Sequence, residues 1–170
     1  MEPEPALIDP QRFPDVRTSD FRAADGTPTY IVPAAKVVEI LRYLRDVERF
    51  TMLEDVTAID WYPKEPRFQV VYNLLSIERQ KVIRIKVDLP AQNPTIATVT
   101  NLWPGANWYE REVFDLFGIN FEGHPDLRRI ELPEDWDGHP LRRDYPVTGP
   151  RRANLPANWI RVEGRSGSPQ

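Results

Sequence analysis

The sequence predicts an α+β fold: a mostly antiparallel sheet with two packed helices, followed by a long irregular extended C-terminal arm. Two segments, 33–50 and 105–118, place apolar residues at helical spacing, and β-prone runs lie between them. Residues 119–170 show neither period. Eighteen prolines in 170 residues, about twice the usual share, exclude helix or central strand from much of the chain. We expect an N-terminal arm over 1–15, an α+β domain over 16–118 and a partner-binding arm over 119–170.

The first expected elements are a hairpin and a helix. Asp25 and Gly26 lie between two short β-prone runs, which is typical of a hairpin turn. Pro33 then opens a helix, since proline is favoured at the first helical position. Apolar side chains recur along this helix at intervals of three and four, and they form one stripe: Val37, Ile40, Leu41, Leu44, Val47 and Phe50.

Three strands are expected next. The run 51–61 is the least regular, and the run 67–76 is apolar on both faces, so the latter is predicted to be central. The run 81–90 alternates, which predicts a half-buried antiparallel strand with one face in water. Its apolar face carries Ile83, Ile85, Val87 and Leu89, and its polar face carries Arg84, Lys86 and Asp88. The six residues 76–81 are short enough for a hairpin connection.

The second helix, Gly105–Gly118, contains a carboxylate that is expected to be buried. At about 100° per residue, Glu110 lies inside the apolar arc, and Gly118 takes the C′ position. Four residues lie on the opposite face: Trp108, Arg111, Glu112 and Asp115. A lone buried carboxylate costs several kcal/mol, so it needs a partner. We expect an arginine from the following segment, among Arg128, Arg129, Arg142 and Arg143. The favoured interpretation is a structural clasp; the alternative is a general base with a raised pKa.

Composition limits the possible functions. The chain has no cysteine, which excludes disulfides, thiolate metal sites and cysteine nucleophiles. No apolar run approaches the ~20 residues that span a bilayer, and the acidic N-terminus resembles neither a signal nor a transit peptide. A cytoplasmic protein of bacterial type is expected. The net charge is −4, yet six arginines and only two acids lie between Arg142 and Arg165, so this tail is expected to contact an acidic surface.

The two histidines of the chain lie in related tetrads, Glu122–Pro125 and Asp137–Pro140, each followed closely by Leu-Arg-Arg. A zinc site of His124, His139 and the two acids has the right donors, but fourteen residues separate the imidazoles. A hydrolytic site lacks a nucleophile elbow at any serine, and nucleic-acid binding fits poorly with a pI near 5.3. The favoured interpretation is an extended arm that lies along another protein, because its main chain needs partners and arginines with aromatics are typical of interfaces.

The run from Asn107 to Pro146, NWYEREVFDLFGINFEGHPDLRRIELPEDWDGHPLRRDYP, closely resembles the signature of one family. This is the thirty-kilodalton subunit, also called the C component, of respiratory complex I, the proton-translocating NADH–quinone oxidoreductase. The matching positions include Glu110, Arg111, Glu112, Asp115, Gly118, His124 and Arg128. Glu131 stands where the family usually has an aliphatic residue. The first thirty residues and the tail after Pro146 do not align with it.

The resemblance implies a non-redox structural subunit of the hydrophilic arm that supports electron transfer from NADH to quinone. FMN, iron–sulfur clusters, NADH and quinone would be held by partner subunits, and no residue of this chain would be catalytic or bind a cofactor or a metal. The expected partners are the quinone-site subunit and iron–sulfur subunits, with no nucleic acid and no membrane span. The expected location is the cytoplasmic side of the bacterial inner membrane.

Two rival functions remain open. One is the equivalent subunit of a related membrane-bound hydrogenase or complex I-like dehydrogenase, and the other is a free-standing metal-binding protein. The residues expected to form the clasp and the partner interface are Glu110, Arg111, Glu112, Asp115, Glu122, His124, Arg128, Arg129, Trp136, His139, Arg142, Arg143, Asp144 and Tyr145.

Overall fold

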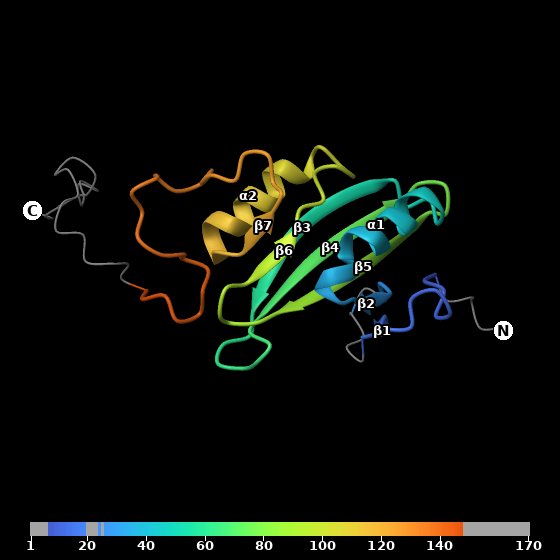
Figure 1. The fold of residues 1–170 in the computed structure, drawn as a ribbon, viewed down its shortest axis with the longest axis horizontal. Coiled ribbons are helices and arrows are strands. Elements are labelled where there is room, and N and C mark those ends of the chain that lie inside the picture. Colours follow the sequence, from blue (N-terminus) through green and yellow to red (C-terminus); the bar gives the residue numbers. More distant parts are fainter. Residues whose placement is uncertain (1–6, 20–23, 25, 148–170) are drawn as a thin grey trace, which may run out of the picture.

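The computed structural model describes residues 7–19, 24 and 26–147. One sheet has five strands in the order β1-β2-β5-β4-β3, and a second small sheet pairs β6 with β7 (Figure 1). The elements are β1 (Arg17–Thr18), β2 (Thr29–Ile31), a 3₁₀ turn (Ala34–Lys36), α1 (Val37–Asp46), β3 (Met52–Asp60), β4 (Phe68–Ser76), β5 (Lys81–Leu89), β6 (Thr95–Ala97), α2 (Ala106–Phe117) and β7 (Asn120–Glu122). The predicted fold class, α+β with a mostly antiparallel sheet and two helices, is confirmed. Within the described residues, neither helix is long and apolar enough to cross a membrane.

The strands β3, β4 and β5 form an antiparallel meander. As predicted, β4 is an interior strand with a neighbour on each side, although the middle position of the five-stranded sheet belongs to β5. The prediction for β5 is only half right. It is antiparallel to β4, but its other neighbour, β2, runs parallel to it, with Tyr30 opposite Ile85. Parallel neighbours need a long crossover connection, and α1, β3 and β4 supply it between β2 and β5 in the sequence. Strand alternation alone does not reveal the direction of a neighbour.

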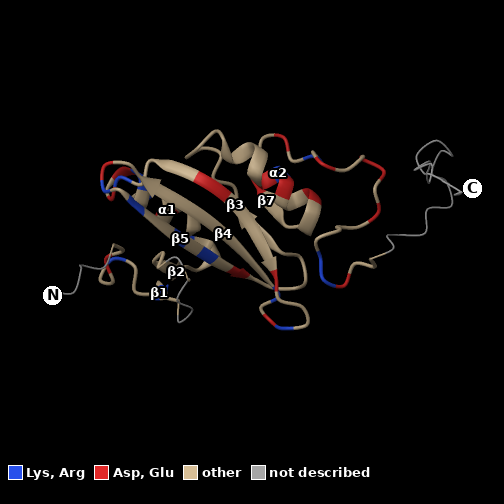
Figure 2. Ribbon diagram, turned by 180° about the vertical axis from the view of Figure 1, so that it is seen from behind, with Lys and Arg blue, Asp and Glu red and all other residues tan. Residues whose placement is uncertain are grey.

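Both helices cover one face of the large sheet, and the opposite face is turned toward the viewer in Figure 2. Alternate residues of β4 and β5 supply the covered face, and cross-strand pairs such as Val70 with Val87 and Tyr72 with Ile85 are completely buried there. The stripe of α1 packs on this face through Ile40, Leu41 and Leu44. The expected apolar faces of α1 and β5 therefore meet in one core.

The first helix is shorter than predicted. It ends at Asp46, and Val47, expected on the apolar stripe, is 54% exposed. The backbone at Arg49 has φ 63°, which turns the chain out of the helical path. Phe50 is buried as expected, but it enters the core from beyond the helix end.

The N-terminal residues contact this domain. Ile8 and Phe13 are buried in the core, whereas residues 1–6 of the expected arm lie outside the described residues. The predicted hairpin is confirmed in its strands, since β1 and β2 pair antiparallel, with Arg17 opposite Ile31. Gly26 has φ 72°, and Asp25, its predicted neighbour in the turn, lies outside the described residues.

The second helix agrees with the prediction, and Gly118 closes it with φ 70° in the left-handed region. The expectation of no regular structure after Gly118 is wrong for three residues. The strand β7 pairs in parallel with β6, with Ile96 opposite Phe121. A three-residue strand is too short to produce a recognisable alternation in the sequence.

Candidate functional site: the anchored C-terminal segment

The C-terminal segment, defined as residues 123–147, has no helix or strand and passes along α2 toward the loop between β3 and β4 (Figure 1). Side chains of the domain anchor it at successive points. Asp115 lies on α2, Asp60 is the last residue of β3, and Arg67 immediately precedes β4. These anchors decide which of the predicted site residues face inward.

Asp115 is the central anchor. Its side chain is completely buried, and Oδ2 accepts hydrogen bonds from the backbone N–H groups of Ile130 (3.0 Å), Glu131 (2.8 Å) and Leu132 (2.9 Å). Oδ1 accepts a fourth bond from Nη1 of Arg129 at 2.5 Å. Burial alone would raise the pKa of this carboxyl, but the donors outweigh it and hold the pKa below its usual value. The arrangement stabilises the carboxylate and fixes three consecutive residues of the segment.

Two arginines extend this anchor. Arg129 also donates through Nη2 to the carbonyl oxygens of Trp136 and Gly138, both at 3.1 Å, so one guanidinium joins two parts of the segment. Arg111 donates from α2 to the carbonyl of Arg128 at 3.2 Å. The prediction that Arg111 and Asp115 lie on the exposed face is wrong, since both are buried. The reason is that residues 128–132 cover that face of the helix.

The second tetrad caps the C-terminal end of α2. Nδ1 of His139 donates to the carbonyl of Asp115 at 2.8 Å, and Nε of Arg142 donates to the carbonyl of Phe117 at 2.6 Å. The last carbonyls of a helix have no partner within the helix, so these donors satisfy them. Burial lowers the pKa of His139, which favours the neutral imidazole. A Cβ at Gly118 would collide with the His139 ring and lie 2.5 Å from Nη2 of Arg142.

A charged clamp holds the end of the segment. Arg67 donates to both carboxylate oxygens of Asp60, at 2.9 and 2.8 Å, and to those of Asp144, at 3.0 and 2.6 Å. Asp60 also accepts the backbone N–H of Arg143 at 2.8 Å. Burial opposes ionisation of Asp60, but Arg67 and the backbone donors prevail and lower its pKa to about 2. Asp60 and Arg67 were not predicted, although Asp60 shares the core-facing parity of Val56.

Glu110 is completely buried, as predicted, but the prediction that an arginine binds it is wrong. Its Oε2 accepts the hydroxyl of Thr98 at 2.5 Å, and its Oε1 accepts the backbone N–H of Val99 at 2.7 Å. Nε2 of His124 lies 4.0 Å from Oε2. Burial raises the pKa of Glu110 to about 7, although the two hydrogen bonds oppose this. An arginine is not required, because a protonated carboxyl is neutral and can itself take part in these hydrogen bonds.

The two imidazoles contact different ends of α2. His124 accepts the backbone N–H of Asp126 on Nδ1 at 3.0 Å, and its Nε2 lies 3.3 Å from the carbonyl of Asn107. His139 bonds the carbonyl of Asp115, eight residues further along, which is about 12 Å at helical rise. One metal ion cannot bind both rings at that separation. No group of three His, Asp or Glu residues that could hold a metal occurs in the described part of the chain.

Several predicted residues are held less firmly. Arg128 is exposed and pairs with Asp126 of its own segment at 2.9 Å, while the hydroxyl of Tyr145 donates to the carbonyl of Asp137 at 3.2 Å. Trp136 is partly buried. Exposed side chains among the predicted set are those of Glu112, Glu122, Arg128, Arg143 and Asp144. Their role in a partner interface stays a prediction.

The idea that the chain after Gly118 must take all of its main-chain partners from other proteins is wrong for the described residues. Side chains of the same chain bind the backbone at residues 128–132, 136, 138 and 143. Residues 148–170, the remainder of the expected arm, lie outside the described residues.

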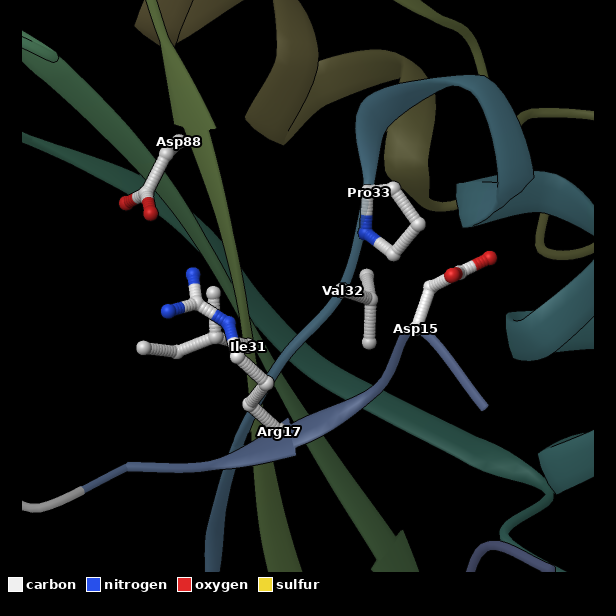
Figure 3. Close-up of a pocket in the computed structure, with 6 residues that line it drawn as sticks. All are labelled: Asp15, Arg17, Ile31, Val32, Pro33 and Asp88. Atoms are coloured by element: carbon white, nitrogen blue, oxygen red, sulfur yellow. The ribbon is translucent and has the colours of Figure 1, made fainter. Parts of the chain in front are cut away.

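A separate pocket lies at the other edge of the sheet (Figure 3). Arg17 and Asp88 extend toward each other above an apolar wall that includes Ile31, while Asp15 points away from them. Asp15 accepts a hydrogen bond from Nζ of Lys36 at 2.7 Å, and Asp88 accepts one from Nε2 of Gln69 at 2.7 Å. None of the predicted site residues lines this pocket.

Comparisons with known proteins agree with the sequence resemblance. A model of the family "Respiratory-chain NADH dehydrogenase, 30 Kd subunit" matches residues 30–151. The C component of NADH-quinone oxidoreductase from Geobacter sulfurreducens is 49% identical over 134 residues, which cover 78% of this chain and 83% of that protein. A C/D fusion protein of NADH-quinone oxidoreductase from Acinetobacter baumannii is 53% identical over 126 residues, which cover 69% of this chain but only 21% of that longer one.

Solved structures have the same fold. A trypsin-resistant fragment of Nqo5 superposes with a TM-score of 0.60 at 34% identity, covering 65% of this chain and 89% of the fragment. A chain of the membrane-bound sulfane sulfur reductase, an archaeal respiratory membrane complex, superposes with a TM-score of 0.64 at 28% identity, covering 81% of each chain. The chain therefore belongs to the family of the 30-kDa subunit of respiratory-chain NADH dehydrogenase, which is the C component of NADH-quinone oxidoreductase.

Proposed function

We propose that this member of the peripheral arm of complex I acts as a docking platform. Its domain holds the C-terminal segment on a fixed path and so presents that segment, and the chain beyond it, to neighbouring subunits. The observation that carries this proposal is the Asp115 anchor, in which one buried carboxylate fixes three successive backbone N–H groups. A segment ordered before assembly loses less conformational entropy when it binds.

The chemistry of the predicted site residues supports a structural role. Asp115, His139 and Arg142 each form hydrogen bonds to the main chain of their own protein. Glu110 is enclosed completely, so a substrate could not reach it without opening the domain. The clasp interpretation is thus retained for the whole set, with Asp115 rather than Glu110 as its centre. In this proposal FMN, iron–sulfur clusters, NADH and quinone are held by other subunits.

The proposed neighbours are the quinone-site subunit and the iron–sulfur subunits, on the cytoplasmic side of the bacterial inner membrane. The C/D fusion relatives support a close neighbour of the C component. In them a region similar to this chain makes up 21% of one longer polypeptide that is named for both components. The exposed charges of Glu112, Glu122 and Arg143 are available for such contacts.

The test uses the intact complex in its native membrane. The full chain is replaced by a chain that ends at Val147, and a chain with residues 148–170 replaced by a Gly/Ser linker serves as the length control. We expect both chains to fold, as judged by circular dichroism, but to be lost from the complex on native gels. The rate of NADH-dependent quinone reduction in these membranes should decrease as the two chains are lost from the complex. Stoichiometric incorporation of both chains would contradict the proposal.

A second candidate is the equivalent subunit of a related respiratory complex. The similarity to a chain of the membrane-bound sulfane sulfur reductase favours keeping it. The identity to that chain is 28%, against 49% to the C component from Geobacter sulfurreducens, so the NADH–quinone complex is preferred. Identifying the proteins that purify with this chain decides between the two: an NADH-binding flavoprotein among them supports the preferred function.

A further inference from the structure

The buried carboxyl of Glu110 has no cation bonded to it. Its side chain is completely covered, and its oxygens accept hydrogen bonds from the hydroxyl of Thr98 and the backbone N–H of Val99. Neither donor carries a charge, so a negative carboxylate is poorly compensated in this site. The imidazole of His124 is placed to offset the charge, but its Nε2 lies 4.0 Å from Oε2, which is too far for a hydrogen bond. Ionised Glu110 therefore favours an arrangement in which water reaches it.

Several elements of the domain enclose Glu110. The β4 strand supplies Tyr72, whose buried hydroxyl has no hydrogen-bond partner among the described residues. Burial and the charge of Glu110 raise the pKa of Tyr72 well above its usual value, so this group stays neutral near pH 7. The β3 strand also packs against α2, but the charge of its Asp55 acts on Glu112. His124, from the turn after β7, is the titratable group of the C-terminal segment that lies beside Glu110.

His124 belongs to a short turn that closes over this site, and we call this turn, residues 123–127, the lid. The N–H of Asp126 donates to Nδ1 of His124 at 3.0 Å, a hydrogen bond within the lid itself. Because Nδ1 accepts this bond, the proton of the neutral ring is on Nε2, which lies 3.3 Å from the carbonyl of Asn107 on α2. This long contact and the partly buried Leu127 connect the lid to the domain. A turn with such contacts opens at a lower free energy than the whole domain unfolds.

We propose that residues 123–127 form a pH-operated lid, which is closed over protonated Glu110 and opens when this carboxyl loses its proton. Opening brings water to the carboxylate, while the anchors further along the C-terminal segment stay in place. The raised pKa of Glu110, about 7, agrees with this geometry, because the closed lid penalises the charge and the open lid restores the ordinary value of 4.5. The lid therefore loosens as the pH rises. It needs no partner subunit to open, so its test is independent of the proposed docking role.

Amide hydrogen exchange of the full chain, followed by NMR from pH 6 to pH 8, measures the opening of the lid directly. The observed rate of each N–H, divided by its intrinsic rate at the same pH, gives the fraction of time that the group is open. The two pKa values of Glu110 predict a rise of about tenfold in this fraction at the N–H groups of His124 and Asp126. The N–H groups of residues 130–132 are the internal control, because they bind Asp115, whose pKa is held below its usual value.

Two matched variants identify the group that titrates. Glu110→Gln cannot ionise, so it should remove the pH dependence at His124 and Asp126. Glu112→Gln should leave the rise unchanged, although it also removes a carboxyl of α2 whose pKa burial raises.

Four results would overturn the lid. These are an open fraction at His124 and Asp126 that stays constant or falls as the pH rises, an equal rise at residues 130–132, a rise that persists in Glu110→Gln, and a rise that disappears in Glu112→Gln. If Glu110→Gln does not fold, the comparison of the lid with residues 130–132 in the wild-type chain, together with Glu112→Gln, decides the question.

Discussion

Replacing Glu110 with glutamine should remove a pH dependence from the stability of the domain. Glutamine has the shape of a protonated glutamate, so its oxygen can accept the N–H of Val99 and its amide can donate to the hydroxyl of Thr98. Both hydrogen bonds of the buried carboxyl are therefore kept. Only the ability to ionise is lost.

The sign of the effect follows from the raised pKa. The folded chain holds a proton on Glu110 up to a pKa of about 7, whereas an unfolded chain releases it near 4.5. Folding stability from this group is complete below pH 4.5, falls as the pH rises and is lost above pH 7. The difference between the two pKa values corresponds to about 3 kcal/mol over that window. Burial lowers the pKa of His139 and gives an opposite slope, but that slope is common to both proteins and cancels in their difference.

Urea unfolding followed by tryptophan fluorescence, at intervals from pH 5 to 8.5, provides the measurement. The free energy of unfolding of Glu110→Gln minus that of the wild type should increase by about 2 to 3 kcal/mol across this range. Glu39→Gln, an exposed position on α1, is the control and should track the wild type. Parallel curves for Glu110→Gln and the wild type would show that Glu110 is ionised throughout, and the reasoning would be refuted.

Three further predictions concern the anchors. Gly118→Ala and Gly26→Ala both place a side chain at positive φ, which costs about 1–2 kcal/mol. Only at position 118 does the new Cβ also collide with an imidazole and a guanidinium, so Gly118→Ala should unfold at a lower urea concentration than Gly26→Ala. Equal urea midpoints for the two variants would contradict this. Asp115→Asn should lower the free energy of unfolding by about 3 kcal/mol and speed tryptic cleavage in the C-terminal segment, whereas Glu112→Gln on the exposed face should change stability by less than about 0.5 kcal/mol. The pKa of Asp60 is lowered to about 2, so ionised Asp60 stabilises the fold above its ordinary pKa of 3.8, and this stabilisation is lost as the pH falls through 2. Asp60→Asn should therefore flatten the acid unfolding curve measured by circular dichroism.

Much of the domain could be predicted because its elements are amphipathic over several turns or residue pairs. The stripe of α1 and the alternation of β5 each repeat often enough to identify the buried face. Gly118 marks the end of α2 because only glycine readily takes its backbone conformation. The burial of Glu110 followed from the same helical geometry, without any knowledge of its partners.

The partners of the buried charges could not be predicted, because they depend on which distant segments meet. Asp60 and Arg143 are 83 residues apart, and no local pattern connects them. Asp115 lies on what would be the exposed face of an isolated α2, and it becomes buried only because an irregular segment covers that face. A helical wheel therefore gives the correct geometry for this helix and the wrong environment for one side of it.

The parallel pairing of β2 with β5 has a consequence for how the domain folds. The turns that join β3 to β4 and β4 to β5 are local, so the meander can form from neighbouring residues. By contrast, β2 pairs with β5, which follows much later in the chain, as the pairing of Tyr30 with Ile85 shows. Closing such a long loop costs more entropy than closing a hairpin. We therefore expect the meander to form first and to act as the folding nucleus, and β1 and β2 to be the last strands that pair with the sheet.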